Sequence, residues 1–288
     1  MRFQIEHNLS YKYSTPVVLD EQTIRLKPRL DTRQKINRFK LDFSPQPSFQ
    51  THYLDCENNA CTTAWFHGST ETFRISAFCD VETFDCNPFD FVLAEPQMNT
   101  LPVAYSEPAR KLLSAYIHIE QSKILEDFVK SILTQTNNEI IPFLTQLAGR
   151  ISKSFTLKER KSGNPREPEI TIKKGIGACR DLSWLYISAC RSLGLATRFV
   201  SGYYVTGELH GEPELHAWAE VYLPGSGWVG FDPSIGLAVA DRHIALASSF
   251  SPAFTMPVTG KLWGKETTQE LDTNITIRER RTPFEGLK

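Results

Sequence analysis

The spacing of apolar residues changes near residue 100, and this change limits the fold more than any other feature of the sequence. From Phe3 to about Phe91, apolar and polar residues alternate in short runs that turn residues interrupt. This period of two is typical of half-buried strands. The spacing becomes helical from about Ser106. The helical segments are 107–118, 122–135 and 139–155.

We therefore predict an α+β protein with two domains. A β-sandwich-like N-terminal domain would occupy residues 1–100, and a second, mixed domain would occupy residues 101–288. The length of 288 residues agrees with this division, because a typical domain has about 150 residues.

The charge balance argues against a nucleic-acid or membrane-surface partner. Lys and Arg number 32 against 33 Asp and Glu, so the net charge is -1 and no global field favours polyanions. No run approaches the roughly 18 apolar residues that span a bilayer. The first 17 residues alternate like a strand rather than a secretory signal. We therefore expect a cytoplasmic protein with reduced thiols.

Cys179 lies where an amphipathic helix is predicted to begin. Leu182, Leu185 and Tyr186 begin the apolar face of this helix. Unpaired N–H groups and the helix dipole favour an anion in a first turn, so this position favours a thiolate. We predict that the glycines at 175 and 177 leave room for a substrate carbonyl, with backbone N–H groups as oxyanion donors.

His216 is the candidate acid and base beside this thiolate. In the predicted strand 215–223, the odd positions are aliphatic and the even positions begin with His216. Asp232 could orient the imidazole, but only in one hairpin register, because side chains alternate along a strand. A three-residue loop that pairs Leu223 with Gly227 places Asp232 diagonal to His216, whereas a four-residue loop turns it away. We predict the three-residue loop.

Each of these residues alone has an ordinary structural explanation. A cysteine at a helix start is usually a small buried residue, a strand histidine is usually only hydrogen bonded, and an Asp before Pro usually forms a turn. Their occurrence together, in the order Cys, His and acid and each on a suitable element, favours a catalytic triad.

Segments 175–204 and 215–234 resemble the core of the bacterial transglutaminase-like superfamily. The resemblance covers about residues 150–240, and the β-rich segment before it resembles the N-terminal domain that often precedes such cores. It implies a papain-like fold with a catalytic triad of Cys179, His216 and Asp232. It also suggests that Tyr203 lines the cleft and that Asp181 has a structural role.

The implied reaction is acyl transfer from a peptide or other amide through a Cys179 thioester. We prefer hydrolysis, as in a peptidase or amidase, because nothing in the sequence identifies an amine site. The alternatives are a protein-glutamine cross-linking transferase and an inactive transglutaminase-like binding module. The expected partner is a peptide or protein amide substrate, and the N-terminal domain could bind a further protein.

The remaining cysteines and histidines give weaker signals. We predict no metal, because the cysteine spacing lacks the paired pattern of a zinc site. We also predict no organic cofactor, because the sequence has no glycine-rich phosphate loop and no dinucleotide-binding fingerprint. Cys190 is predicted to be buried, and His243 has no partner that the sequence reveals. The cysteines of the N-terminal domain are interpreted as structural thiols, with a disulfide or zinc site as alternatives; they are Cys56, Cys61, Cys79 and Cys86.

Overall fold

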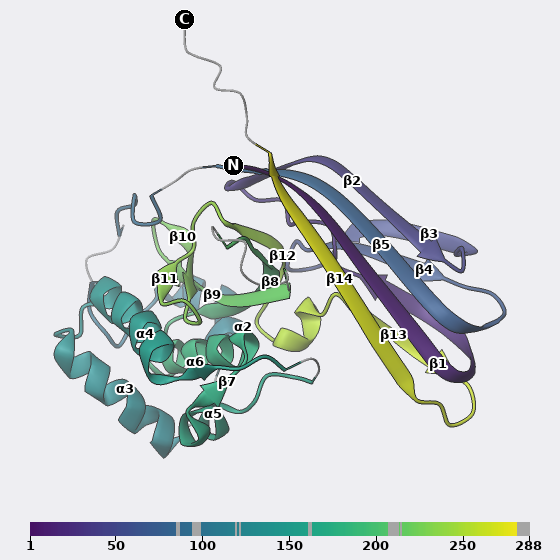
Figure 1. Cartoon of the computed structure of the whole chain (residues 1–288). Coiled ribbons are helices and arrows are strands. Elements are labelled where there is room, and N and C mark those ends of the chain that lie inside the picture. Colours follow the sequence, from purple (N-terminus) through teal and green to yellow (C-terminus); the bar gives the residue numbers. More distant parts are fainter. Residues whose placement is uncertain are drawn as a thin grey trace, which may run out of the picture.

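The computed structural model contains a long β-sheet beside a smaller mixed α/β unit (Figure 1). The α+β class predicted from the sequence is confirmed. The structure describes residues 1–84, 87–93, 99–118, 120, 122–160, 163–206, 213 and 215–280.

The long sheet is organised around β1, a strand of 23 residues. One edge of β1 pairs with β5 and then β4, and the other pairs with β14 and then β13. Phe66, which follows β4, packs against Phe43 of β2 and Phe73 of β5, with ring centroids 5.9 and 5.1 Å apart. These strands therefore share one apolar core. The strands are β1 (Arg2–Ile24), β2 (Gln34–Ser44), β3 (Phe49–Leu54), β4 (Ala60–Trp65), β5 (Ser69–Thr83), β13 (Val258–Trp263) and β14 (Gln269–Arg280).

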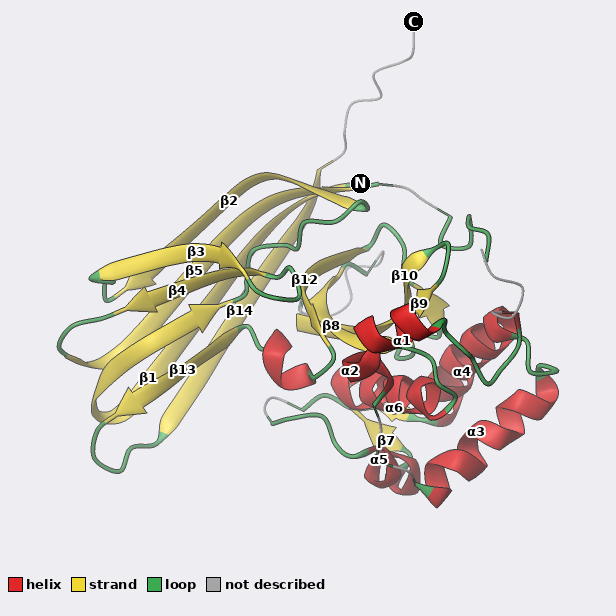
Figure 2. Cartoon of the chain, turned by 180° about the vertical axis from the view of Figure 1, so that it is seen from behind, coloured by secondary structure: helices red, strands yellow, loops and turns green. Residues whose placement is uncertain are grey.

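The last two strands of the chain correct the division at residue 100. We assigned all residues after 100 to the second domain, but β13 and β14 return to the first sheet (Figure 2). β14 pairs with β1 from Arg2↔Arg280 to Tyr13↔Gln269. Without this partner, one edge of β1 would expose a row of unpaired N–H and C=O groups.

The mixed unit is built on a five-stranded sheet in the order β11-β10-β9-β8-β12. The α-helices lie on the far side of the mixed unit from the long sheet, and β12 lies near the long sheet (Figure 1). Two short strands, β6 (Thr156–Leu157) and β7 (Ile176–Gly177), pair separately. The five strands are β8 (Thr197–Tyr204), β9 (Leu215–Leu223), β10 (Gly227–Asp232), β11 (Leu237–Ala238) and β12 (His243–Ser249).

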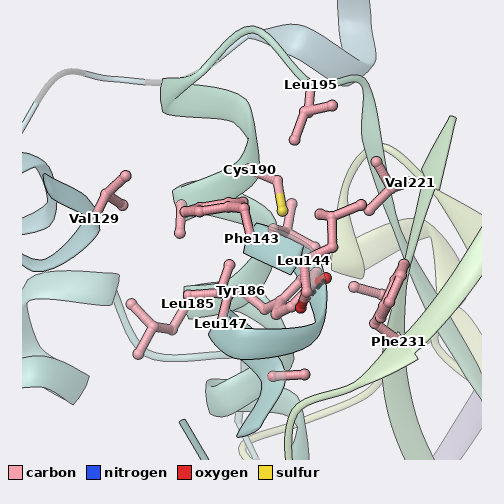
Figure 3. Packing of buried hydrophobic residues seen from close by; sticks show 14 of the residues in the cluster. Val129, Phe143, Leu144, Leu147, Leu185, Tyr186, Cys190, Leu195, Val221 and Phe231 are labelled. Atoms are coloured by element: carbon pink, nitrogen blue, oxygen red, sulfur yellow. Dashed lines mark hydrogen bonds between the residues drawn. The ribbon is translucent and has the colours of Figure 1, made fainter. Parts of the chain in front are cut away.

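Helices α1 to α4 lie within the segments predicted to be helical and α6 begins at Cys179 as predicted, whereas α5 and η2 were not predicted. Helix α6 is central among them. Its residues Leu185, Tyr186 and Cys190 are fully buried against α4 and the sheet (Figure 3). Ser122 caps α3, because its hydroxyl accepts a hydrogen bond from the Leu125 N–H. The helices are α1 (Glu107–Leu112), α2 (Ser114–Ile117), α3 (Lys123–Gln135), α4 (Ile140–Ser154), α5 (Pro168–Lys174), α6 (Cys179–Ser192) and the 3₁₀-helix η2 (Pro252–Thr255).

The two sheets are joined by apolar and ionic contacts. Tyr203, Ile244 and Leu246 of the smaller sheet are buried in the core of the long sheet. Arg29, just after β1, donates two hydrogen bonds to Glu220 on β9, at 3.2 and 2.8 Å. The N-terminal region is therefore packed against the sheet that carries His216 and Asp232.

Candidate active site

Cys179 is the first residue of α6, as predicted, and is partly buried. The turn before it is held by Asp181, whose carboxylate accepts hydrogen bonds from the N–H of Ala178 at 3.0 Å and of Arg166 at 2.8 Å. Burial alone would raise the pKa of Asp181, but these bonds and one from Arg160 lower it instead. Asp181 therefore has the structural role that the resemblance implied.

The backbone conformation accounts for the two glycines before Cys179, and our expectation that they leave room for a substrate carbonyl stays a prediction. Gly175 ends α5 in the left-handed region, with φ of 61°, where a side chain is unfavourable. A Cβ at Gly177 would lie only 3.0 Å from the Cβ of Asp181 and 3.2 Å from Leu182. Gly177 thus allows the chain to approach α6 closely.

The predicted register of the β9–β10 hairpin is confirmed. Leu223 pairs with Gly227 across a three-residue turn, and the ladder continues to Phe231↔Ala219. Gly227 adopts a positive φ of 71° at this turn. Because Phe231 pairs with Ala219, the next residue, Asp232, lies opposite Trp218. Trp218 is two residues after His216, so Asp232 and His216 face the same side of the sheet.

His216 connects Cys179 with Asp232. Its Nε2 lies 2.6 Å from Oδ2 of Asp232, and the imidazole is also close enough to the Cys179 thiol to interact with it electrostatically. Asp232 is fully buried, while the His216 side chain is 15% exposed. The three predicted residues thus meet in the geometry of a nucleophile, a base and an orienting carboxylate.

The electrostatics of this group favour a charged imidazolium beside a carboxylate. Burial alone would lower the pKa of His216, but the charge and hydrogen bond of Asp232, together with Cys179, raise it to about 10. Burial would likewise raise the pKa of Asp232, but His216 and His243 hold it well below its usual range. His216 therefore carries a proton that it can donate to a leaving amine.

Two further side chains contact Asp232 that the sequence analysis did not select. Ser234 donates to Oδ1 of Asp232 from its hydroxyl at 2.6 Å and from its N–H at 3.0 Å. Nε2 of His243 lies 3.2 Å from Oδ2 of Asp232. Ser234 was detectable as a hydroxyl two residues after Asp232, a common turn pattern. His243 had no such signal, because only the pairing of β12 with β8 brings it to the site.

Tyr203 does not line the site, and its neighbour Tyr204 takes this place. Tyr203 is 1% exposed, and its hydroxyl contacts Nδ1 of His7 in β1 at 2.9 Å. Gly202 pairs with His216, so Tyr204, two residues along β8, shares the face of His216. The Tyr204 ring centroid lies 5.4 Å from that of His216 and 4.7 Å from that of His243.

The other cysteines lie apart from this group. Cys190 is fully buried, as predicted, and burial raises the pKa of its thiol. Cys61 and Cys79 are buried and Cys56 is exposed, and all three are free thiols. Cys86 lies outside the described residues. Among the residues that the structure describes, no three His, Cys, Asp or Glu side chains are grouped so that they could hold a metal.

A pocket of about 390 Å³ lies on the Trp218 side of the smaller sheet, between this sheet and the segment 29–34. His243 and Trp218 line it together with Arg29 and Arg198, whereas Cys179 does not. The guanidinium of Arg198 stacks 4.2 Å from the Trp228 ring centroid in its wall. The pocket therefore adjoins the triad through His243 but does not include the Cys179 thiol.

Two family models match separate parts of the chain. Residues 126–233 match the model described as "Transglutaminase-like superfamily", and residues 3–82 match "Bacterial transglutaminase-like N-terminal region". The resemblance inferred from the sequence is confirmed by these matches.

Similar proteins cover nearly the whole chain. An uncharacterized protein of Mycobacterium tuberculosis (strain ATCC 25618 / H37Rv) is 25% identical over 99% of this chain and 94% of its own length. An uncharacterized protein of Mycobacterium leprae (strain TN) is 20% identical over 96% of this chain and 98% of its own length. The crystal structure of a "Putative Cysteine Protease from Cytophaga hutchinsonii" has a TM-score of 0.68 and 17% identity, and covers 98% of this chain and 92% of that one. It shares the fold.

Within the described part of the chain, the helices are too short or too polar to cross a bilayer.

Proposed function

We propose that this chain, which belongs to the transglutaminase-like superfamily through residues 126–233, is a cysteine-dependent enzyme that cleaves a peptide or other amide bond. The observation that carries the proposal is the placement of His216, which is hydrogen bonded to Asp232 and interacts electrostatically with Cys179 at the start of α6. A thiolate beside an imidazolium is the reactive form of a cysteine nucleophile.

The first half of the reaction forms a thioester. The Cys179 thiolate attacks the amide carbonyl carbon, and the oxygen takes up the negative charge. We propose that the backbone N–H of Cys179, the first residue of α6, stabilises this oxyanion. The C–N bond then breaks, and His216 donates its proton to the departing amine. Asp232 keeps the imidazole oriented.

The second half returns the enzyme to its starting state. Water gives a proton to the now neutral His216 and attacks the thioester carbon, which releases the acid and the Cys179 thiolate. An amine in place of water would give cross-linking. We propose hydrolysis, because a transferase needs a site that binds the amine and keeps water from the acyl-enzyme.

Trp65 does not supply a second oxyanion donor. Transglutaminase-like enzymes of animals use a tryptophan upstream of the nucleophile, and Trp65 is the only tryptophan before Cys179 in this sequence. Its ring packs against Phe49 in the long sheet, with centroids 5.5 Å apart. The proposed oxyanion site therefore assigns no role to Trp65.

We also propose a substrate class, a partner and a cellular compartment for this enzyme. The substrate is a peptide or protein amide, and the long N-terminal sheet could bind a further protein. We place the enzyme in the cytoplasm, where the free thiols of its described cysteines stay reduced.

The test is turnover of an amide library by the full chain, with and without a primary amine. Pooled peptides are incubated with the wild type and with Cys179→Ala, and mass spectrometry identifies products and any acyl adduct on Cys179. We expect hydrolysed products that Cys179→Ala does not form.

Products carrying the added amine would instead support the cross-linking transferase. Equal product formation by the wild type and Cys179→Ala, with no adduct on Cys179, would contradict the proposal and favour a binding module.

A further inference from the structure

We propose that His243 is a positioning residue that holds the Asp232 carboxylate in place for His216. This inference rests on the proposed function and extends it to a residue outside the Cys, His and Asp triad. His243 is 8% exposed and touches Asp232 directly, with Nε2 3.2 Å from Oδ2.

The carboxylate of Asp232 is held on both oxygens. Ser234 donates twice to Oδ1, at 2.6 and 3.0 Å. His216 and His243 both approach Oδ2, at 2.6 and 3.2 Å. Because a carboxylate only accepts hydrogen bonds, a neutral His243 must carry its proton on Nε2. A rotation of the carboxylate away from His216 would therefore break the bonds to Ser234 and His243 together.

Strand β12 brings His243 to this position, and the N-terminal region holds β12. β12 is the last strand of its sheet, so its outer edge needs hydrogen-bond partners. Gln34 supplies them at Ala245, where its amide donates to the carbonyl at 2.8 Å and accepts from the N–H at 3.0 Å. Asn59 does the same at Ser248, at 2.9 and 2.7 Å.

These two side-chain amides act as a substitute for a neighbouring strand. Gln34 is 6% exposed and Asn59 is fully buried, so their hydrogen bonds are shielded from water. Successive residues of β12 point to opposite sides, so Ile244 enters the core of the long sheet while His243 faces the triad. The N-terminal region thus contributes to the site through the placement of His243.

Several titratable groups surround the two imidazoles. Cys179 and Asp232 face His216, from α6 and β10. The Tyr204 ring of β8 lies against both histidines. A change in the environment of His216 must therefore be separated from a change in its contact with Asp232. The proton shared by His216 and Asp232 reports this contact directly.

The test measures that proton by NMR in the full chain, with ¹⁵N-labelled histidine, in the wild type, His243→Gln and His243→Leu. Gln retains a side-chain N–H for Asp232, whereas Leu fills similar space without a donor. We expect the low-field Nε2–H signal of His216 to exchange with water about tenfold faster in His243→Leu, the change that loss of one charge-assisted hydrogen bond corresponds to. His243→Gln should exchange at nearly the wild-type rate.

Turnover of a substrate identified with the amide library gives the second readout. We expect His243→Leu to lower kcat about tenfold with little change in KM, and His243→Gln to retain most of kcat. Wild-type exchange and kcat in His243→Leu would overturn the inference, as would equal losses in both variants, which would indicate a packing role. The exchange measurement does not depend on activity, so a wild type without turnover would contradict the proposed function while His243 could still be judged.

Discussion

At the scale of single residues, the site is organised around one buried carboxylate. Asp232 is fully buried and accepts hydrogen bonds from His216, His243 and Ser234. A buried charge is tolerated only where such partners compensate the loss of water. The same contacts stabilise the imidazolium form of His216, so folding and the proposed chemistry depend on the same charges.

The pair of Asp232 and His216 makes the free energy of unfolding depend on pH in a defined way. Asp232, with its lowered pKa, stabilises the fold above its unfolded value of about 4, and this contribution is lost as the pH falls below that value. His216, with its pKa raised to about 10, contributes fully below its unfolded value of about 6.5, and loses the contribution as the pH rises to about 10.

We therefore expect the wild type to exceed Asp232→Asn most in unfolding free energy between about pH 4 and 6.5. Urea unfolding from pH 3 to pH 10 measures this difference. A difference that does not change with pH would show that the two groups are not coupled in the folded protein.

At the scale of elements, the turn before α6 and the hairpin after it place the triad. The hairpin register could be predicted because only one loop length puts Asp232 on the face of His216. The role of Gly177 could not, because it depends on how closely the chain approaches α6, and that of Gly175 depends on the left-handed end of α5, a helix that the sequence did not predict.

Two Gly→Ala changes should have opposite effects on stability. Gly149 lies inside α4, and a Cβ there would meet no atom within 4 Å. Gly149→Ala should therefore raise the unfolding free energy by about 0.5–1 kcal/mol. Gly177→Ala should lower it by about 1–3 kcal/mol, because the new Cβ would lie 3.0 Å from Asp181. Urea unfolding of both variants measures the effects, and a shift of the same sign in both would contradict this account.

At the scale of the whole molecule, the N-terminal and C-terminal regions of the chain together form the long sheet, which lies beside the smaller sheet. The sequence predicted the strand-rich segment before residue 91 and the helices α1 to α4 and α6, because apolar spacing is a local property. It did not predict that β14 pairs with β1 or that His243 reaches Asp232. Both depend on contacts between distant segments, for which the sequence offered no register signal such as the short hairpin loop.

The ionic contact between the two sheets should contribute strongly to stability. The Glu220 carboxylate is buried between Arg29, at 2.8 Å, and Arg198, at 2.6 Å. Glu220→Gln leaves two buried guanidinium groups without this charge and should cost about 3–5 kcal/mol of unfolding free energy. The exposed pair of Lys40 and Asp42 provides the control, since Asp42→Asn should cost less than about 1 kcal/mol. Equal costs in urea unfolding would contradict this difference.

The most direct test of the central claim, that His216 activates Cys179, is the rate at which iodoacetamide alkylates each cysteine at pH 6. Cys56 is an exposed free thiol in the same chain and serves as the internal reference, while Cys179 is partly buried. Because the thiolate is the reacting form, we expect Cys179 to react at least about tenfold faster than Cys56, and to lose this advantage in His216→Ala. Quantitative peptide mass spectrometry provides both rates. A Cys179 that reacts no faster than Cys56, with a rate that His216→Ala leaves unchanged, would contradict the account.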